Sequence, residues 1–252
     1  MIAIPRTKYG LHFHDVFFSD DPLAAREQFS LAHFSQAALP LAGLEPCATK
    51  VVNLRVDEGP LFTALSSNTR YKIRRAEREG IIPRLISKPT PNDLDTFCTF
   101  YDTFATQKQR GASNRPKVRA LTERDALILS FADTHDGATV AAHAYVADSQ
   151  ILRTRLLYSA SHFRGTDDSE TRNCIGRANR FLHWHEIEQF KQLGYESYDL
   201  GGIPLDESDP EKNAIARFKS EFGGHHIIEF NGYRSSLPFV RHAITFARGI
   251  LS

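Results

Sequence analysis

The chain has 252 residues, 41% of them hydrophobic and 24% charged, and 31 basic against 30 acidic residues give a formal net charge of +1. This composition is typical of a soluble globular protein with a sizeable core, and the balanced charge argues against a nucleic-acid binder with one broadly basic face. No apolar run approaches 20 residues, no signal peptide is recognisable, and no CxxC pair occurs, so we expect a cytoplasmic protein with reduced cysteines at Cys47, Cys98 and Cys174.

Residues 1–58 are expected to form a strand-rich segment, in which "HDVFFS" and "TKVVNLRV" suit strands and "DPLAAREQFSLAHFSQAAL" has a helical pattern. The next stretch predicts a helix within 60–80, with Ser66 or Ser67 as its N-cap and Gly80 just after its end. At 100° per residue, the helix has a packing side and a basic side. The packing side holds Leu65, Thr69, Ile73 and Ala76, and the basic side holds Arg70, Arg74 and Arg78.

Two more helices are predicted at 92–111 and about 117–127, after which the hydrophobic period changes. In "ALILSFADTHDGATVAAHAYVADSQILRTRLLYSAS", three apolar runs are separated by turn signals, which predicts an antiparallel meander. A helix at 176–194 and a strand at 196–200 follow. The remaining elements are a short helix in "PEKNAIARFKSEFGG", a strand in "HHIIEFNGYRS" and a helix at 236–252. This order predicts an α+β fold around one mixed sheet.

Three stretches occur in order around the meander: "LSSNTRYKIRRAEREG", "ANRFLHWHEIEQFKQLGYESYDLGGI" and "AIARFKSEFGG". Together they resemble the Fem family of peptidoglycan aminoacyltransferases and the related GNAT-fold acyltransferases, over roughly residues 51–233. The resemblance implies a GNAT-like fold, its mixed central sheet flanked by helices, and direct acyl transfer to an amine. The chain is too short for two modules, so we expect an N-terminal extension or remnant module at 1–58, a GNAT-like domain at 59–235 and a C-terminal helix at 236–252.

GNAT-fold enzymes that use acetyl-CoA carry the pattern Arg/Gln-x-x-Gly-x-Gly/Ala, where x is any residue. The pattern stands where a loop enters a helix. The stretch "NCIGRA" fits at Gly176 and Ala178, while Arg172 stands one place early. Free amides and a helix N-terminus attract pyrophosphate. We therefore expect residues 172–178 to bind acyl-CoA, in the first place acetyl-CoA, through Arg172, Gly176, Arg177 and Ala178, the alternative being an ordinary helix start.

The basic helix allows two interpretations. Exposed arginines commonly only solvate a helix, and acidic residues nearby could pair with them. The resemblance favours an anion site, because Arg forks bind phosphate oxygens and the acceptors of the family often carry nucleotide- or lipid-linked phosphates. The predicted partner is a small-molecule or lipid-linked acceptor with an anionic group, held by Arg70, Lys72 and Arg74.

By resemblance, Lys219 and its neighbour Phe218 lie at the active site. A cation there would stabilise the tetrahedral oxyanion of acyl transfer. Asp199 ends a strand and could accept the amine proton, and Gly201 and Gly202 would let a ligand approach the backbone closely. The alternatives are a surface lysine and an aspartate that caps a turn.

Tyr158 and His143 lie on meander strands, which line the cleft in GNAT folds, and are further candidates for catalysis and substrate binding. A histidine on a strand is, however, more often a packed residue. His183 and His185 are two apart on a helix and do not share a face. No cysteine or carboxylate completes a ligand set at the usual spacing, so no metal site is expected.

These features predict a GNAT-fold N-acyltransferase that moves an acyl group from acyl-CoA to an amine of a cell-envelope or polysaccharide precursor. One alternative is a Fem-type enzyme that uses aminoacyl-tRNA, in which the basic helix would help to hold RNA and binding would weaken steeply with salt. The other is a non-catalytic GNAT-fold binding module. The presence of Lys219, Asp199 and the Gly-Gly pair argues against this last alternative.

Overall fold

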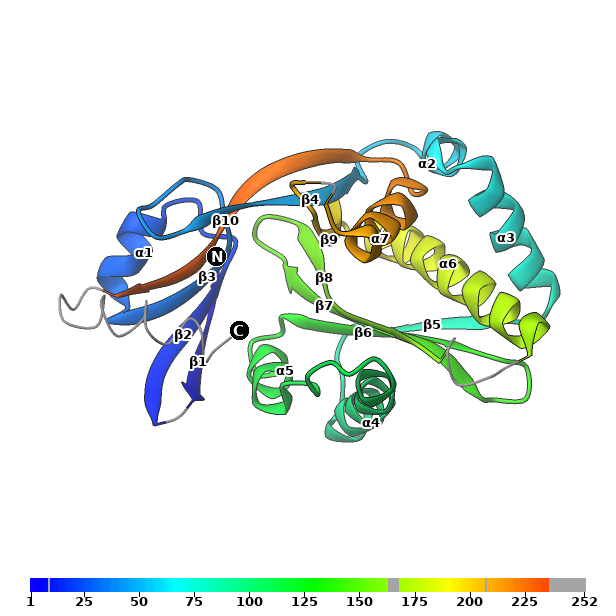
Figure 1. The fold of residues 1–252 in the computed structure, drawn as a ribbon, viewed down its shortest axis with the longest axis horizontal. Coiled ribbons are helices and arrows are strands. Elements are labelled where there is room, and N and C mark those ends of the chain that lie inside the picture. Colours follow the sequence, from blue (N-terminus) through cyan, green and yellow to red (C-terminus); the bar gives the residue numbers. More distant parts are fainter. Residues whose placement is uncertain (9, 163–167, 207, 236–252) are drawn as a thin grey trace.

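The computed structural model describes residues 1–8, 10–162, 168–206 and 208–235. These residues form a ten-stranded mixed sheet in the order β1-β2-β3-β10-β4-β9-β8-β7-β6-β5 (Figure 1). The strands are β1 (Ile2–Lys8), β2 (Leu11–Phe17), β3 (Leu31–Ala37), β4 (Glu45–Asn53), β5 (Ile82–Ile86), β6 (Leu127–Asp133), β7 (Thr139–Asp148), β8 (Arg153–Ser161), β9 (Ser197–Ile203) and β10 (His225–Ser235). The helices are α1 (Pro22–Gln28), α2 (Glu58–Ala64), α3 (Ser67–Arg78), α4 (Pro91–Gln107), α5 (Arg115–Thr122), α6 (Ser169–Gln192) and α7 (Pro210–Ser220).

The predicted meander is confirmed, since β6, β7 and β8 pair antiparallel in that order. The next strand, β9, lies beside β8 and runs parallel to it. Because a parallel neighbour requires a crossover, the chain passes through α6 between the two strands. The α+β fold with one mixed sheet is therefore confirmed.

The packing side of α3 is confirmed, as Leu65 just before the helix and its residues Thr69, Ile73 and Ala76 are buried. The Ser66 hydroxyl accepts a hydrogen bond from the Thr69 amide at 3.1 Å, so Ser66 is the N-cap. Gly80 follows the helix with φ +75°, a conformation that glycine adopts without strain.

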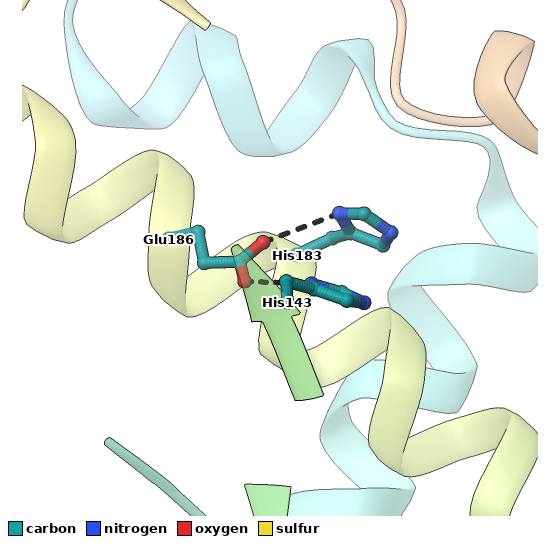
Figure 2. A group of neighbouring side chains, drawn as sticks. All are labelled: His143, His183 and Glu186. Carbon is teal, nitrogen blue, oxygen red and sulfur yellow. Dashed lines mark hydrogen bonds and ion pairs between the residues drawn. The ribbon is translucent and has the colours of Figure 1, made fainter. Parts of the chain in front are cut away.

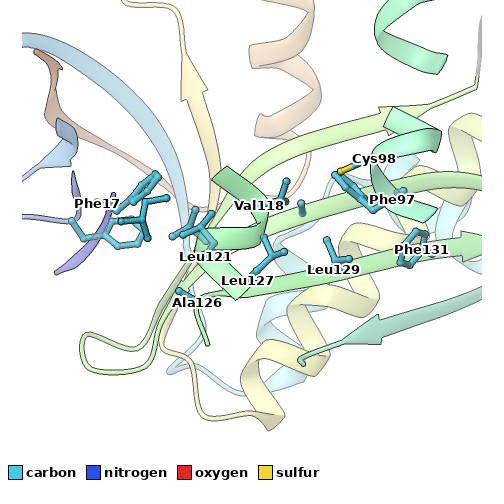
Figure 3. Close-up of a cluster of buried hydrophobic side chains, with 14 residues drawn as sticks. Phe17, Phe97, Cys98, Val118, Leu121, Ala126, Leu127, Leu129 and Phe131 are labelled. Carbon is cyan, nitrogen blue, oxygen red and sulfur yellow. The ribbon is translucent and has the colours of Figure 1, made fainter. Parts of the chain in front are cut away.

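Helices cover both faces of the sheet (Figure 1). On one face α6 crosses β5, β6 and β7 and carries α3 on its outer side, and on the other α4 packs on β7 and β8. On α6, Trp184, Ile187 and Phe190 recur at helical spacing and are buried. A separate apolar cluster joins α4, α5 and β6 and reaches Phe17 of β2 (Figure 3).

The N-terminal segment is part of the same sheet. The helical pattern predicted for "DPLAAREQFSLAHFSQAAL" is wrong in its second half, where α1 ends at Gln28 and β3 begins at Leu31. This half forms a strand because β10 pairs with it, from Phe230↔Ala37 to Ser235↔Leu31. On its other edge β10 pairs with β4, so it joins β1–β3 to the rest of the sheet.

Among the described residues, no helix combines the length and the apolar character that crossing a bilayer requires. The helix predicted at 236–252 lies outside the described residues.

Candidate active site

A cleft opens where β8 and β9 part. The two strands pair only over Arg153–Arg155 and Ser197–Asp199, and beyond these residues an open cleft of about 830 Å³ lies between them. In β8, Ala144 pairs with Tyr158 and Tyr145 with Leu156, so Leu157 forms a bulge in the cleft wall. The lining residues come from α4 and the loop after it, β8, α6, β9 and α7, and include Tyr101, Phe104, Arg155, Tyr158, Asn179, His183, Gly201, Gly202, Phe218 and Lys219.

Lys219 lines this cleft near the end of α7. It is half-buried, and its Nζ donates a hydrogen bond to the carbonyl oxygen of Gly202 at 2.6 Å. Burial lowers the pKa of Lys219 to about 8, with Arg155 acting in the same direction and Asp199 opposing it. The ammonium therefore lies beside the β9 backbone and titrates close to neutral pH.

Arg155 brings a second cation to the cleft wall. Within the described part of the chain, no hydrogen bond or ion pair reaches its guanidinium, and its Nε is buried without a partner. Burial lowers the pKa of this guanidinium, although an arginine remains charged in proteins. Arg155 is half-buried, and the carboxylates of Asp199 and Glu229 act on its charge without forming an ion pair with it, so its guanidinium is open to an anionic ligand in the cleft.

Asp199 does not line the cleft, which corrects its predicted role as a proton acceptor there. Its side chain is buried on the sheet face opposite Tyr198, because successive strand residues point to opposite faces. The carboxylate accepts hydrogen bonds from Arg153 at 2.6 Å and from the Gly201 amide at 2.7 Å, and also from Thr49 and Gln36. Asp199 is therefore an anchor between β4, β8 and β9.

Four other predicted residues do line the cleft, namely Tyr158, Gly201, Gly202 and Phe218. The Tyr158 hydroxyl accepts a hydrogen bond from the Asn114 amide at 3.2 Å, which ties β8 to the start of α5. Gly201 has φ +80°, and an added Cβ would lie 3.3 Å from the Leu156 carbonyl oxygen, so a side chain there would be strained. The structure thus places these residues in the same cleft as Lys219.

A buried polar network lies behind the cleft, centred on Glu186 of α6. One carboxylate oxygen accepts from Ser130 and from His143 Nδ1 at 2.7 Å, and the other accepts from the hydroxyls of Tyr145 at 2.5 Å and Tyr198 at 2.9 Å. Burial alone would raise the pKa of Glu186, but His143 and the hydrogen bonds outweigh it and hold the pKa far below its usual range. Glu186 is therefore ionised.

Asn179 and His183, one turn apart on α6, connect this network to the cleft, which both of them line. His183 Nδ1 lies 3.2 Å from a Glu186 carboxylate oxygen, as Figure 2 marks, and 2.6 Å from the Tyr198 hydroxyl. Burial and the neighbouring His143 lower the pKa of His183 to about 4, so its imidazole is neutral at pH 7. Asn179 Oδ1 lies 3.0 Å from His143 Nε2.

His143 is not a cleft residue, because its ring is fully buried and both nitrogens have partners inside the protein, Glu186 (Figure 2) and Asn179. This corrects the prediction that His143 binds substrate. His143, His183 and Glu186 offer ligand atoms within 4.8 Å of one another, a set that could hold a metal ion. The Glu186 oxygens, however, already accept hydrogen bonds from Ser130 and two tyrosines, so hydrogen bonding accounts for the arrangement.

The predicted donor loop at 172–178 is wrong, because these residues lie inside α6, which begins at Ser169. Asp168 caps the helix by accepting from the Thr171 amide at 2.7 Å. Of the four predicted residues, Arg172 and Gly176 sit on the first turns, Arg177 pairs with Glu79 and Glu170, and Ala178 is buried. The residues that line the cleft do not include these four.

The predicted anion site on α3 is also outside the cleft lining. Arg70 donates to the carbonyl oxygens of Thr63 at 2.7 Å and Leu65 at 2.5 Å, which satisfies the end of α2 and complements its helix dipole. Arg74 lies 5.3 Å from the centre of the Phe62 ring. Lys72 is half-buried, and burial and Arg180 lower its pKa. The arginines are aligned because they contact α2.

Sequence reasoning missed Arg155, Asn179, His183 and Glu186. A usable signal existed for the last two, because His183 and Glu186 are three residues apart and share a helix face. His185, by contrast, is two residues from His183 and lies on another face of the helix. For Arg155 the strand pattern gave no signal. This residue reaches the cleft only because β8 and β9 stop pairing there, which the sequence of one strand does not show.

The family model of the acetyltransferase (GNAT) domain matches residues 64–219, more than half of the chain. No curated protein sequence matches significantly. Solved structures with a similar fold include FemX, which is 13% identical with a TM-score of 0.61 over 84% of this chain and 68% of FemX. The C-terminal domain of a putative lysylphosphatidylglycerol synthetase from Agrobacterium fabrum is 15% identical with a TM-score of 0.59, over 99% of this chain and 84% of that domain.

A third similar structure, L-PGS from Bacillus licheniformis, is 14% identical with a TM-score of 0.57, over 94% of this chain and 82% of that protein. At these identities the likeness establishes the fold, and the family match over 64–219 establishes the class of enzyme. The resemblance drawn from the sequence is thereby confirmed. The chain belongs to the acetyltransferase (GNAT) domain family and is a GNAT-fold acyltransferase.

Proposed function

We propose that this protein is a cytoplasmic N-acyltransferase that moves an acyl group from acyl-CoA, in the first place acetyl-CoA, to an amine of an anionic cell-envelope or polysaccharide precursor. The observation that carries the proposal is the cleft between β8 and β9, in which Lys219 and the unpartnered Arg155 lie together. The cleft is large enough for a small-molecule ligand, and its two cations suit anionic substrates.

In the proposed reaction, the amine attacks the thioester carbonyl and the C–S bond breaks as the amide forms. The Lys219 ammonium stabilises the oxyanion of the tetrahedral intermediate. Direct transfer is supported by the cysteines, all three of which are described and none of which lines the cleft. Burial raises the pKa of each of these thiols, which disfavours the reactive thiolate.

The resemblance to the Fem family leaves the alternative of an aminoacyl-tRNA donor, and the similarity to a domain of a putative lysylphosphatidylglycerol synthetase suggests a lipid-linked acceptor. The basic helix α3 lends this donor little support, because Arg70 and Arg75 are engaged with α2, Glu79 and Glu170. We therefore retain acyl-CoA as the proposed donor and use tRNA as a contrasting arm of the test.

Acetyl-CoA is expected to raise the melting temperature of the protein, because a ligand that binds only the native state at a hundred times its Kd adds about 2.7 kcal/mol of stability. Ala214→Glu, which places a negative charge in the cleft lining, should reduce the shift, whereas Ala112→Glu at an exposed position outside it should not. Stabilisation by alanyl-tRNA and none by acetyl-CoA would show that the donor proposal is wrong.

Arg155→Gln is expected to raise the KM for a phosphate-bearing acceptor by about tenfold or more, since a hydrogen bond to a charged group contributes about 1.5–3 kcal/mol. The assay follows free CoA thiol with acetyl-CoA and a matched pair, glucosamine 6-phosphate and glucosamine. Arg217→Gln, on the exposed side of α7, serves as the control. Equal losses with both acceptors would rule out recognition of the phosphate by Arg155.

A further inference from the structure

The network behind the cleft is more polar than packing requires. Glu186 is fully buried and ionised. Its one carboxylate is contacted by five polar side chains, those of Ser130, Tyr145, Tyr198, His143 and His183. Apolar residues of similar volume fill such a position at no loss of stability in many proteins. A function for this arrangement is therefore to be sought where it meets the cleft, at His183.

The hydrogen bonds around Glu186 favour one tautomer of His183. Both tyrosine hydroxyls can donate to Glu186, so the Tyr198 oxygen and the carboxylate face His183 Nδ1 as acceptors. With Tyr198 donating to Glu186, the proton of the neutral imidazole is assigned to Nδ1 and the lone pair to Nε2. In Figure 2 this second nitrogen points away from Glu186. No hydrogen bond reaches His183 Nε2 from any residue that the structure describes.

We propose that His183 is a catalytic residue of the acyl transfer, whose Nε2 accepts the proton of the attacking amine, and that Glu186 is the positioning residue that holds its tautomer. The inference rests on the proposed function. As the N–C bond forms, one amine proton moves to Nε2. As the C–S bond breaks, the same proton passes to the leaving sulfur, so that amide and free CoA thiol are the products. A base whose orientation is held by a carboxylate follows the logic of catalytic triads.

Several charged or titratable groups face His183 from the elements packed around it. They are His143 and Tyr145 of β7, Glu186 of its own helix, Tyr198 of β9 and Lys219 of α7. Lys219 and His143 disfavour a proton on His183, whereas Glu186 favours it. The imidazole is thus neutral at pH 7, and its Nε2 lone pair lies at the cleft that also holds the cation proposed to stabilise the oxyanion.

The first test reads the tautomer directly, by long-range ¹H–¹⁵N NMR of the ¹⁵N-labelled protein. We expect His183 to show a protonated Nδ1 and an unprotonated Nε2 at pH 7. This readout needs no substrate. A proton on Nε2 at pH 7, or a single Zn²⁺ bound by His183 when the metal is added, would overturn the inference.

The second test measures transfer from acetyl-CoA to glucosamine. We expect His183→Ala to lower kcat about a hundredfold with little change in the KM for acetyl-CoA, and added imidazole to restore part of the rate. Tyr198→Phe keeps the fold but removes the hydroxyl beside Nδ1, and should lower kcat and shift the acidic limb of the pH profile. His185→Ala, two residues along α6 and outside the cleft lining, is the matched control.

The outcomes separate the two proposals. If the wild type transfers the acetyl group and His183→Ala does so equally well, the role of His183 is disproved and the proposed function stands. If the wild type shows no transfer to a panel of amines, the proposed function fails and this inference fails with it. A loss in His183→Ala that imidazole does not relieve, together with the same loss in His185→Ala, would assign His183 a structural role.

Discussion

Lys219→Met lowers kcat by about 10²–10³-fold in our expectation, which is the effect of removing one donor from an oxyanion site. The side chain keeps its length but loses the ammonium that lies 2.6 Å from the Gly202 carbonyl oxygen. Folding should be little affected, because burial penalises this charge in the folded protein. The measurement is kcat for acetyl transfer, with Lys212→Met on the exposed part of α7 as the control.

The pH dependence distinguishes the two roles that this lysine can play. If the ammonium stabilises the oxyanion, kcat falls as the pH rises through about 8, because the protonated form disappears above its pKa. Lys219→Arg should then retain part of the activity and lose this alkaline limb. An activity that instead rises through pH 8 would identify neutral Lys219 as the base, contrary to the assignment made above.

Glu186→Gln is expected to destabilise the protein by about 3–5 kcal/mol, the usual result of removing one partner from a buried charge network. The amide would turn an NH₂ group toward donors such as Tyr145, Tyr198 and His143, which then lose their acceptor. Urea unfolding measures the difference. Glu188→Gln on the same helix is the control, because burial and Glu58 raise the pKa of Glu188 to about 7 and its charge contributes no comparable stability. Equal losses in both variants would contradict the prediction.

The same network makes stability sensitive to acid. The pKa of Glu186 is lower in the folded protein than in the unfolded chain, so its contribution is present above the unfolded value of about 4.3 and is lost as the pH falls. His183 acts in the same direction: between about 6.5 and 4 the unfolded chain binds a proton that the folded one does not. Unfolding measured from pH 7 to 3 should therefore show a decline in stability, to which His183 contributes between about 6.5 and 4 and Glu186 below about 4.3, and His183→Asn should flatten the upper part.

The sequence predicted those helices and strands whose boundaries are marked by their own cap or turn residues. Ser66 and Gly80 marked the ends of α3, and the turn signals of the meander placed β6, β7 and β8 correctly. The start of α6 was missed because Gly176 was treated as the beginning of a helix. Asp168 followed by Glu170 is the stronger start signal, and a glycine is tolerated in a helix interior at about 1 kcal/mol.

The predictions that were wrong concern features that depend on contacts between residues far apart in the sequence. β3 resembles a helix until β10 pairs with it, some 200 residues later. The alignment of Arg70 and Arg74 was real, but a helix pattern does not say which neighbour the face contacts, and here α2 is that neighbour. The cleft exists because two strands part, and no single strand carries that information.

The position of β10 has a consequence for how the protein is made. Its pairing joins His225 to Val51 and Ser235 to Leu31. The early strands β3 and β4 therefore cannot complete their pairing until β10, the last described strand, has been synthesised. At ribosomal rates of 5–20 residues per second, β4 leaves the ribosome roughly 10–40 s before its partner is synthesised. During that interval β3 and β4 present unpaired edges, which are prone to aggregate. Closure of the sheet is then a late event with long loops to close, the kind of topology that folds slowly.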